Sequence, residues 1–419
     1  MARAHILGAG LSGLSAAVEL AAAGLDITLY EAAGEAGGRC RTFHDAALDC
    51  IIDNGNHLLL SGNYGAMAFL DRIGTTDELS GPPEARFNFV DIGTNERWCV
   101  RPNKGRLPWW IFAPSRRVAG TKVTDYLAAS KILNAGPDDV FTSIISPDGA
   151  LYERFWEPIV VGALNIDPYE AAAILLKPVL LETFAKGADA CRPLIAKTGL
   201  GETFVAPALK YLSEKGADIR FGARVKGFET DNGRIAKLDG VGEAVGTGDV
   251  VICAVPWWNA ERLLPDYAGP TGVEPILNAH FRLKEPFKGY EDDPVVGVIG
   301  GLAQWLFIRG DVVSVTVSAA GRHTREANEA TVEKIWDDVR KALNLGDEPL
   351  PRWRIIKEHR ATFRQTPEQI KLRPGAITAI GNLFLAGDWT DTKLPATIEG
   401  SIRSGKTAAG LALEKFDIA

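Results

Sequence analysis

Short apolar runs that end at glycines or at an acidic residue mark both ends of this chain. Residues 4–7 form an apolar run that predicts a β-strand, and the glycine-containing segment 8–13 leads into an Ala/Leu pattern with helical spacing through Ala23. A second apolar run, 27–30, ends at Glu31. Near the other end, the run 383–386 precedes a Gly-Asp pair, and small residues then continue in a helical pattern to Ala412. These patterns predict strand–helix–strand units and an α/β fold with a parallel sheet.

Between these ends, the pattern predicts one further nucleotide-domain strand and two long insertions. The run 250–256 is continuously apolar, as expected for a buried strand. We predict a discontinuous nucleotide-binding domain (1–62, 190–262 and 372–419) and a mixed α+β substrate domain (63–189 and 263–371). In the substrate domain, 168–180 has a helical pattern, and the strand-like runs 278–283 and 312–318 predict an antiparallel sheet that floors a cavity.

Composition narrows the class of protein. The chain has 419 residues, 46% hydrophobic and 24% charged, which is typical of a globular protein of two or three domain-sized units. A net charge of −7 argues against a nucleic-acid partner. The five cysteines are scattered without a CxxC pair and the six histidines lack ligand spacing, so we predict reduced thiols and no metal. No apolar run reaches the ~18 residues of a membrane span. No secretory leader is expected, since the first strand begins close to Met1, and the predicted location is cytoplasmic.

The first strand–helix–strand unit carries the chemistry of a dinucleotide site. Gly8 allows the tight turn after the strand, Gly10 lets the backbone approach a pyrophosphate, and Gly13 lets the helix pack closely on the strand. The helix N-terminus offers free N–H groups to phosphates. Glu31, at the end of the second strand, is placed to accept hydrogen bonds from ribose hydroxyls.

The residues that follow make the chain resemble the flavin amine oxidase and phytoene desaturase superfamily. The stretch 37–42, Gly-Gly-Arg-Cys-Arg-Thr, completes the extended fingerprint of that superfamily, and the stretch 387–400 resembles its C-terminal flavin motif. The resemblance implies a Rossmann-type FAD-binding domain of the glutathione-reductase and amine-oxidase type. It also implies FAD without a covalent link, since no cysteine follows Cys253. The cofactor-binding residues implied or indicated in this way are Gly8, Gly10, Leu11, Ser12, Gly13, Glu31, Ala32, Gly38, Arg39, Gly55, Asn56, His57, Val225, Ala254, Gly387, Asp388, Thr397 and Ile398.

Three stretches, 53–64, 155–165 and 387–405, resemble more closely the squalene-associated FAD-dependent enzymes of bacterial hopanoid biosynthesis. This resemblance covers nearly the whole chain and implies reductive loss of an allylic hydroxyl from hydroxysqualene, a long apolar isoprenoid, to give squalene. An acid must protonate the leaving hydroxyl, and His57 or Tyr64 are the candidates. His57 packing on the flavin edge without a catalytic role is an equal alternative. Asn165 is either a polar orienting group or a turn former.

Other functions remain open at this stage. The chain could use FAD in the oxidising direction, as an isoprenoid desaturase or an amine-type oxidase. No tyrosine follows Tyr290, so only Trp353 and Trp389 could supply the aromatic cage of an amine oxidase. A non-catalytic alternative is prenyl binding of the GDP-dissociation-inhibitor type, which the intact flavin motifs argue against. The sequence does not identify the external electron donor.

The segment 107–117 predicts a contact with a membrane surface. Trp109, Trp110, Ile111 and Phe112 form an apolar cluster, and two arginines follow at 116 and 117. Tryptophans beside basic residues are typical of membrane interfaces. The alternative is a buried loop of the substrate domain. On the membrane interpretation, the protein binds peripherally and takes its insoluble substrate from the bilayer.

Overall fold

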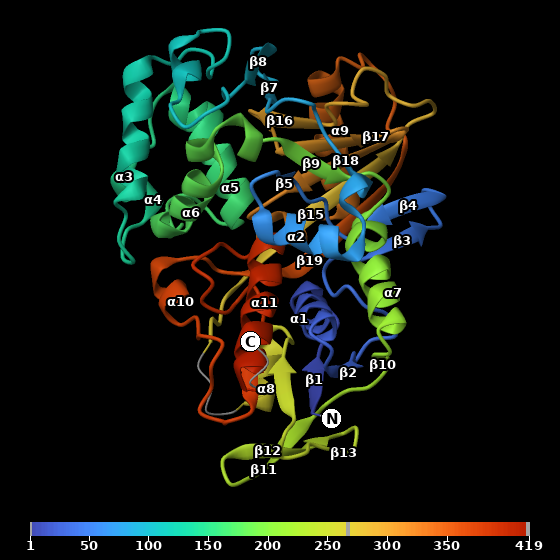
Figure 1. Ribbon diagram of the computed structural model, residues 1–419. Coiled ribbons are helices and arrows are strands. Elements are labelled where there is room, and N and C mark those ends of the chain that lie inside the picture. Colours follow the sequence, from blue (N-terminus) through green and yellow to red (C-terminus); the bar gives the residue numbers. More distant parts are fainter. Residues whose placement is uncertain (1, 265–268, 416–419) are drawn as a thin grey trace.

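A five-stranded parallel sheet, built from strands that are far apart in the sequence, organises the lower half of the molecule (Figure 1). The computed structural model describes residues 2–264 and 269–415. The strand order is β10-β2-β1-β14-β20, and all neighbours are parallel. The bounds are β1 (Arg3–Leu7), β2 (Asp26–Tyr30), β10 (Asp218–Arg220), β14 (Val250–Cys253) and β20 (Leu383–Leu385).

The two faces of this sheet are covered by different layers. Alternation along β1 explains this, because successive side chains of a strand point to opposite faces. Ala4 and Ile6 pack with the helices α1 (Leu11–Ala22), α7 (Ala206–Glu214) and α11 (Ile398–Lys415). Leu7 packs instead with Ile235 and Leu238 of the small antiparallel sheet β11 (Gly227–Asp231), β12 (Arg234–Asp239) and β13 (Glu243–Ala244). This three-layer arrangement confirms the predicted α/β class.

A seven-stranded sheet forms the upper half, with the order β19-β15-β18-β17-β16-β7-β8. The helix α9 (Asn328–Leu343) packs in one apolar cluster with strands β15–β18. The runs predicted near 278–283 and 312–318 are the strands β15 and β18 of this sheet. The predicted antiparallel pairing holds except for β16 and β7, which are parallel. The bounds are β7 (Phe87–Asp91), β8 (Glu96–Val100), β15 (Val273–Arg282), β16 (Val295–Ile299), β17 (Trp305–Arg309), β18 (Val312–Val317) and β19 (Arg352–Phe363).

The remaining elements lie around these two sheets. The pair β3–β4 is a hairpin, and β9 pairs with both β5 and β6. In the part of the chain that the structure describes, no helix is both long and apolar enough to cross a membrane. The bounds are β3 (Thr42–Asp45), β4 (Cys50–Asp53), β5 (Leu59–Leu60), β6 (Leu79–Ser80), β9 (Pro193–Ala196), α2 (Tyr64–Ile73), α3 (Ala129–Leu133), α4 (Phe141–Ile144), α5 (Glu157–Leu164), α6 (Leu176–Glu182), α8 (Trp257–Leu263) and α10 (Pro367–Lys371).

The predicted helix over 168–180 is wrong at its start. Asp167 closes a turn instead, with its carbonyl accepting from Ala171 N–H (3.0 Å) and its side chain accepting from Tyr169 N–H (2.9 Å). The carbonyl of Ala171 then accepts from Phe141 N–H (2.8 Å), which holds this stretch in extended pairing. Helical structure begins only at Ala173 and continues through α6 to Glu182.

The predicted domain boundaries remain a prediction. All five strands of the parallel sheet fall in the three segments predicted for the nucleotide domain. The strand β9, at the start of the second segment, pairs outside that sheet. Residues 1, 265–268 and 416–419 of the predicted ranges lie outside the described residues.

Two glycines of α11 provide a matched test of the packing between α1 and α11. A Cβ on Gly405 would lie 2.1 Å from the carbonyl oxygen of Ser12, whereas a Cβ on Gly410 meets nothing within 4 Å. Gly405→Ala therefore forces two helices apart and should lower the free energy of unfolding by ~1–3 kcal/mol. Gly410→Ala should raise it by ~0.5–1 kcal/mol, because alanine favours a helix interior. Urea denaturation followed by circular dichroism measures both. Equal effects of the two substitutions would contradict the close packing at Gly405.

Candidate active site

A large cavity lies between the parallel sheet and the seven-stranded sheet. Its volume of about 860 Å³ is near the upper end of the ~300–1,000 Å³ typical of small-molecule sites. One part of its wall consists of the glycine-rich turn after β1, the end of β2 and the start of α11. Another part consists of α5, α6 and five strands of the seven-stranded sheet, β7, β15, β17, β18 and β19. We call these parts the nucleotide arm and the apolar arm.

Close packing requires glycine at two positions of the nucleotide arm, and the pyrophosphate contact expected at Gly10 remains a prediction. Gly8 has φ +101°, and a Cβ there would lie 2.8 Å from the carbonyl oxygen of Ala254. A Cβ on Gly13 would lie 1.9 Å from the carbonyl oxygen of Gly8, so only glycine lets α1 pack so close to the turn. Gly10 lines the cavity, and no described atom lies within 4 Å of where its Cβ would be. The backbone at Gly10 is therefore open to a ligand.

Glu31 closes the nucleotide arm at the end of β2. Its Oε2 accepts from Ala9 N–H (2.8 Å) and its Oε1 accepts from Ala33 N–H (2.8 Å). These bonds fix the carboxylate at the cavity wall. Each carboxylate oxygen accepts more than one hydrogen bond, so the group retains capacity for ligand hydroxyls.

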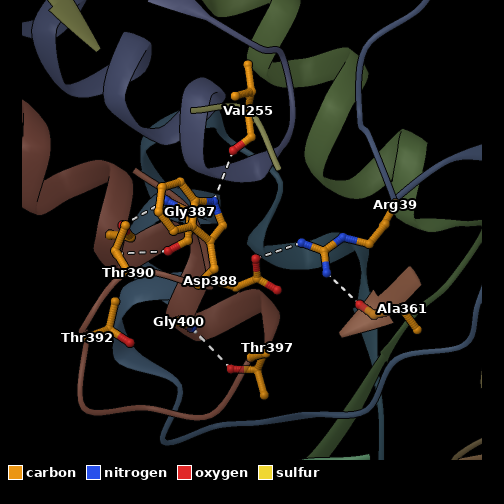
Figure 2. A network of polar contacts seen from close by, with 12 residues as sticks. Arg39, Val255, Ala361, Gly387, Asp388, Thr390, Thr392, Thr397 and Gly400 are labelled. Atoms are coloured by element: carbon orange, nitrogen blue, oxygen red, sulfur yellow. Dashed lines mark hydrogen bonds and ion pairs between the residues drawn. The ribbon is translucent and has the colours of Figure 1, made fainter. Parts of the chain in front are cut away.

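An ion pair joins the two ends of the chain at the cavity wall. The guanidinium of Arg39 donates to Asp388 Oδ1 (2.7 Å) and to the carbonyl oxygen of Ala361 (2.5 Å), as Figure 2 shows. Arg39 belongs to the Gly-Gly-Arg loop and Asp388 to the C-terminal motif, and both line the cavity. The sequence analysis placed Arg39 among the cofactor-binding residues. In the structure, two of its donors hold the protein itself together.

The loop that carries Asp388 is held by two further side chains, and the sequence analysis predicted this role for neither of them. The indole N–H of Trp389 donates to the carbonyl oxygen of Val255 (3.0 Å), across to the loop after β14 (Figure 2). Arg373 is buried and donates to the carbonyl oxygens of Leu394 (2.7 Å) and Asp388 (3.1 Å). Burial lowers the pKa of Arg373 to about 10, so the side chain stays protonated at neutral pH. Arg373 stands outside every cofactor fingerprint, and no sequence signal marks it.

The apolar arm has a wall of large aliphatic and aromatic side chains. Strand β17 contributes two aromatic rings, and helices α5 and α6 contribute aliphatic groups. Trp353, one of two tryptophans that the sequence offered for an aromatic cage, lies in another apolar cluster, whereas Trp389 lines the cavity. The main apolar residues of this wall are Leu58, Leu60, Phe87, Ile159, Val179, Phe184, Trp305 and Phe307.

A group of three neutral polar side chains interrupts this apolar wall. Asn278 on β15 faces Thr316 on β18 as a cross-strand pair, and the Thr316 hydroxyl donates to Asn278 Oδ1 (2.9 Å). The amide nitrogen of Asn56 donates to Thr316 Oγ1 (3.2 Å). All three residues line the cavity. The sequence signal for Asn278 and Thr316 was a polar position within an apolar strand, but their pairing depends on the register.

The two candidate acids differ in position. His57 lines the cavity, and burial lowers its pKa to about 4, against a smaller opposing effect of Asp53. Its imidazole is therefore neutral at pH 7. Tyr64 is 44% exposed at the start of α2, with the Lys186 ammonium 4.2 Å from its ring centre, and it does not line the cavity. Tyr64 therefore lies away from the cavity wall, and its role as an acid remains a prediction.

Asn165 ends the helix α5 and links it to the large sheet, which agrees with the turn-former alternative. It ends α5 in the left-handed conformation (φ 50°). Its amide nitrogen donates to the carbonyl oxygen of Glu274 and to Thr362 Oγ1 (both 3.0 Å). Its amide oxygen accepts from Ala319 N–H (2.8 Å). Both amide atoms therefore hold α5 against the ends of the large sheet.

The structure brings the predicted cofactor-binding residues together at one cavity. Seventeen of them line it, and Gly13 lies just behind the wall. Their contacts with a cofactor remain predictions. Within residues 2–264 and 269–415, no group of three or more His, Cys, Asp and Glu side chains is placed to hold a metal ion.

Comparisons with known proteins agree with this geometry. The sequence model of the flavin containing amine oxidoreductase family matches residues 11–413. A hydroxysqualene dehydroxylase from Sinorhizobium fredii is 48% identical over 98% of both chains. One from Rhodopseudomonas palustris is 43% identical, also over 98% of both chains. A crystal structure of a putative protoporphyrinogen oxidase from Exiguobacterium sp. 255-15 has the same fold, with a TM-score of 0.67 and 18% identity over 99% of both chains. The chain therefore belongs to the flavin containing amine oxidoreductase family and, within it, to the hydroxysqualene dehydroxylase family.

Proposed function

We propose that this protein is an FAD-dependent enzyme that reductively removes the hydroxyl group of hydroxysqualene to give squalene. The observation that carries the proposal is the continuity of the cavity, in which a nucleotide arm and an apolar arm share one space. The full-length similarity to proteins named hydroxysqualene dehydroxylase supports the choice of substrate. A continuous cavity lets a polar cofactor and a hydrocarbon meet without intervening water.

FAD fits the residues of the nucleotide arm. Backbone N–H groups at the start of α1 suit a pyrophosphate, and the fixed carboxylate of Glu31 suits the hydroxyls of a ribose. The start of α11 also faces the cavity, and its partial positive charge favours an anion there. Non-covalent attachment is favoured because burial raises the pKa of the cavity-lining Cys40 thiol to about 12, which keeps it protonated and unreactive.

The atoms and charges of the proposed dehydroxylation balance. The allylic carbon–oxygen bond breaks, the hydroxyl takes a proton and leaves as water, and the carbon takes a hydride. When bound and reduced, FAD supplies the hydride. The apolar arm excludes water from the allylic cation. The neutral cluster of Asn56, Asn278 and Thr316 offers hydrogen bonds that orient the hydroxyl without placing a fixed negative charge beside it.

The direct test of this function uses anaerobic enzyme whose flavin has been reduced by light. Mixed with hydroxysqualene, it should form one squalene for each flavin oxidised, as measured by gas chromatography and flavin absorbance. The matched control is oxidised enzyme with squalene, which should leave the flavin oxidised. Flavin reduction by squalene or another polyene hydrocarbon would favour the desaturase alternative, and an amine that reduces the flavin would favour an oxidase.

Substitution of Glu31 tests the nucleotide arm. Glu31→Gln keeps the shape of the side chain but removes its negative charge. Each charge-assisted hydrogen bond from the carboxylate to a ribose hydroxyl contributes ~1.5–3 kcal/mol to FAD binding, and the neutral amide would weaken these bonds. The variant should purify with less flavin and regain activity with added FAD. Flavin is measured in the supernatant after acid precipitation, and flavin that stays with the precipitated chain would contradict non-covalent attachment. Unchanged flavin occupancy after dialysis would contradict the role of Glu31.

The lowered pKa of His57 leads to a test of the proton donor. Because its pKa is about 4, the imidazole carries no proton to donate as an imidazolium at neutral pH. From about pH 6 to about pH 8, kcat/KM of the wild type and of His57→Gln should therefore follow the same pH dependence. The loss of activity should stay below the ~100-fold that a general acid contributes. An inflection in the wild-type profile that the variant lacks would restore His57 as the acid.

A further inference from the structure

Two exposed aromatic rings form an apolar knob on the outer edge of the upper half of the molecule. Trp109 and Phe112 belong to the 3₁₀ turn η2 (Trp109–Phe112) and are 63% and 58% exposed. Their ring centres are 5.9 Å apart, so each ring covers part of the other and both still face outward. Leu107 (64% exposed) and Leu127 (71% exposed) extend the exposed apolar residues of this part of the chain. An exposed apolar cluster of this kind on a globular protein marks an interaction site.

The structure corrects the set of residues that the sequence assigned to a membrane. Trp110 is buried, its ring packs edge-on against Tyr126 at 5.3 Å, and its backbone N–H donates to Asn103 Oδ1 (2.9 Å). Ile111 is half-buried. Four consecutive residues of one 3₁₀ turn point in different directions, so only Trp109 and Phe112 are free to contact a partner.

The segment that carries this knob is rich in basic residues. The segment 101–131 contains seven arginines and lysines but a single acidic residue, Asp125, in a protein whose net charge is −7. In the described part of the chain, no ion pair joins any of the seven to a carboxylate. The nearby Arg154, by contrast, pairs with Glu96 (2.7 Å). The five exposed cations are Arg101, Lys104, Arg106, Lys122 and Lys131.

The knob is held in a fixed position by the protein. The guanidinium of Arg116 donates to the carbonyl oxygens of Arg101 (2.9 Å) and Pro102 (3.1 Å), and that of Arg117 donates to the carbonyl oxygen of Ile111 (3.0 Å). These two arginines, which the sequence analysis counted toward a membrane contact, therefore hold the segment in place. A preorganised surface loses little conformational entropy when it binds.

This surface lies on the outside of the apolar arm. The carbonyl of Asn103 accepts from Ala188 N–H (2.9 Å), a few residues after the cavity-lining Phe184. Trp110 belongs to the same apolar cluster as the cavity-lining Phe87 and Phe307. The helix α3, which carries Lys131, packs near α6 at this edge, as Figure 1 shows. A partner bound to the knob would therefore adjoin the wall of the apolar arm.

We propose that the surface made by Trp109, Phe112, Leu107, Leu127 and the five exposed cations docks on an anionic lipid bilayer. The rings and leucines enter the headgroup region, and the lysines and arginines bind lipid phosphates. Charge complementarity carries this choice, because unpaired cations beside exposed tryptophan and phenylalanine match an anionic interface in both charge and polarity. The proposal concerns a surface and does not depend on the identity of the substrate.

Flotation of the purified holoenzyme with lipid vesicles tests the proposal. Vesicles of phosphatidylcholine with about 30% phosphatidylglycerol should bind the protein at least about tenfold more tightly than pure phosphatidylcholine, and added salt should weaken the binding. Trp109→Ser/Phe112→Ser should weaken binding to both kinds of vesicle about tenfold or more. Lys104→Gln/Arg106→Gln should weaken binding only to anionic vesicles, about thirtyfold.

Matched control variants carry the same changes on other surfaces. Ile377→Ser/Phe221→Ser removes two exposed apolar residues elsewhere, and Lys210→Gln/Lys406→Gln removes two exposed cations of α7 and α11. Both controls should bind vesicles as the wild type does. Flavin content and the unfolding midpoint confirm that every variant is folded. Wild-type protein that floats with neither kind of vesicle overturns the proposal. So does a Trp109→Ser/Phe112→Ser variant that binds normally, or one that instead changes the oligomeric state.

Discussion

The helices α1 and α11 pack so closely that only glycine fits between them at position 405. This contact brings the N-termini of both helices, each with a partial positive charge, to one cavity. At Gly405 the helices α1 and α11 approach so closely that the Ser15 hydroxyl donates to the carbonyl oxygen of Ile402 (2.9 Å). Both helices begin at the cavity wall, at Leu11 and Ile398. A third helix, α2, begins nearby. The N–H groups of Gly65 and Ala66 in its first turn donate to the buried carboxylate of Glu399. The protein neutralises that third end itself and leaves the other two for an anionic ligand.

The sequence was most informative where the role of a residue depends only on its neighbours in the chain. The turn at Gly8, the packing at Gly13 and the carboxylate of Glu31 each follow from a few neighbouring residues, and the structure places them as the spacing indicates. Requirements that depend on distant segments were missed. The pairing of Asn278 with Thr316 exists only once the register of two strands is set. Arg373 holds the loop of the C-terminal motif but lies outside that motif, so no pattern marked it.

Burial was the other property that the sequence could not supply. Trp109 and Trp110 are identical neighbours, yet the tertiary structure buries one and exposes the other. His57 was chosen as an acid from its ordinary pKa, and the enclosed site lowers that pKa until the group is neutral. In both cases the residue type indicated where a functional region lies but did not indicate what each residue does there. The reason is that the solvent access of a side chain is set by elements far along the chain.

The pairing of Arg39 with Asp388 has a consequence for how the molecule is made. The two residues are 349 positions apart, and β20, an edge strand of the parallel sheet, lies just before Asp388. Contacts of such long sequence separation form late in folding, after much loop-closure entropy has been lost. A nascent chain on the ribosome therefore cannot assemble this cofactor pocket until the segment around Asp388 has been translated. Until then, the unpaired edge of the sheet and the apolar cavity wall are surfaces at which the chain can aggregate.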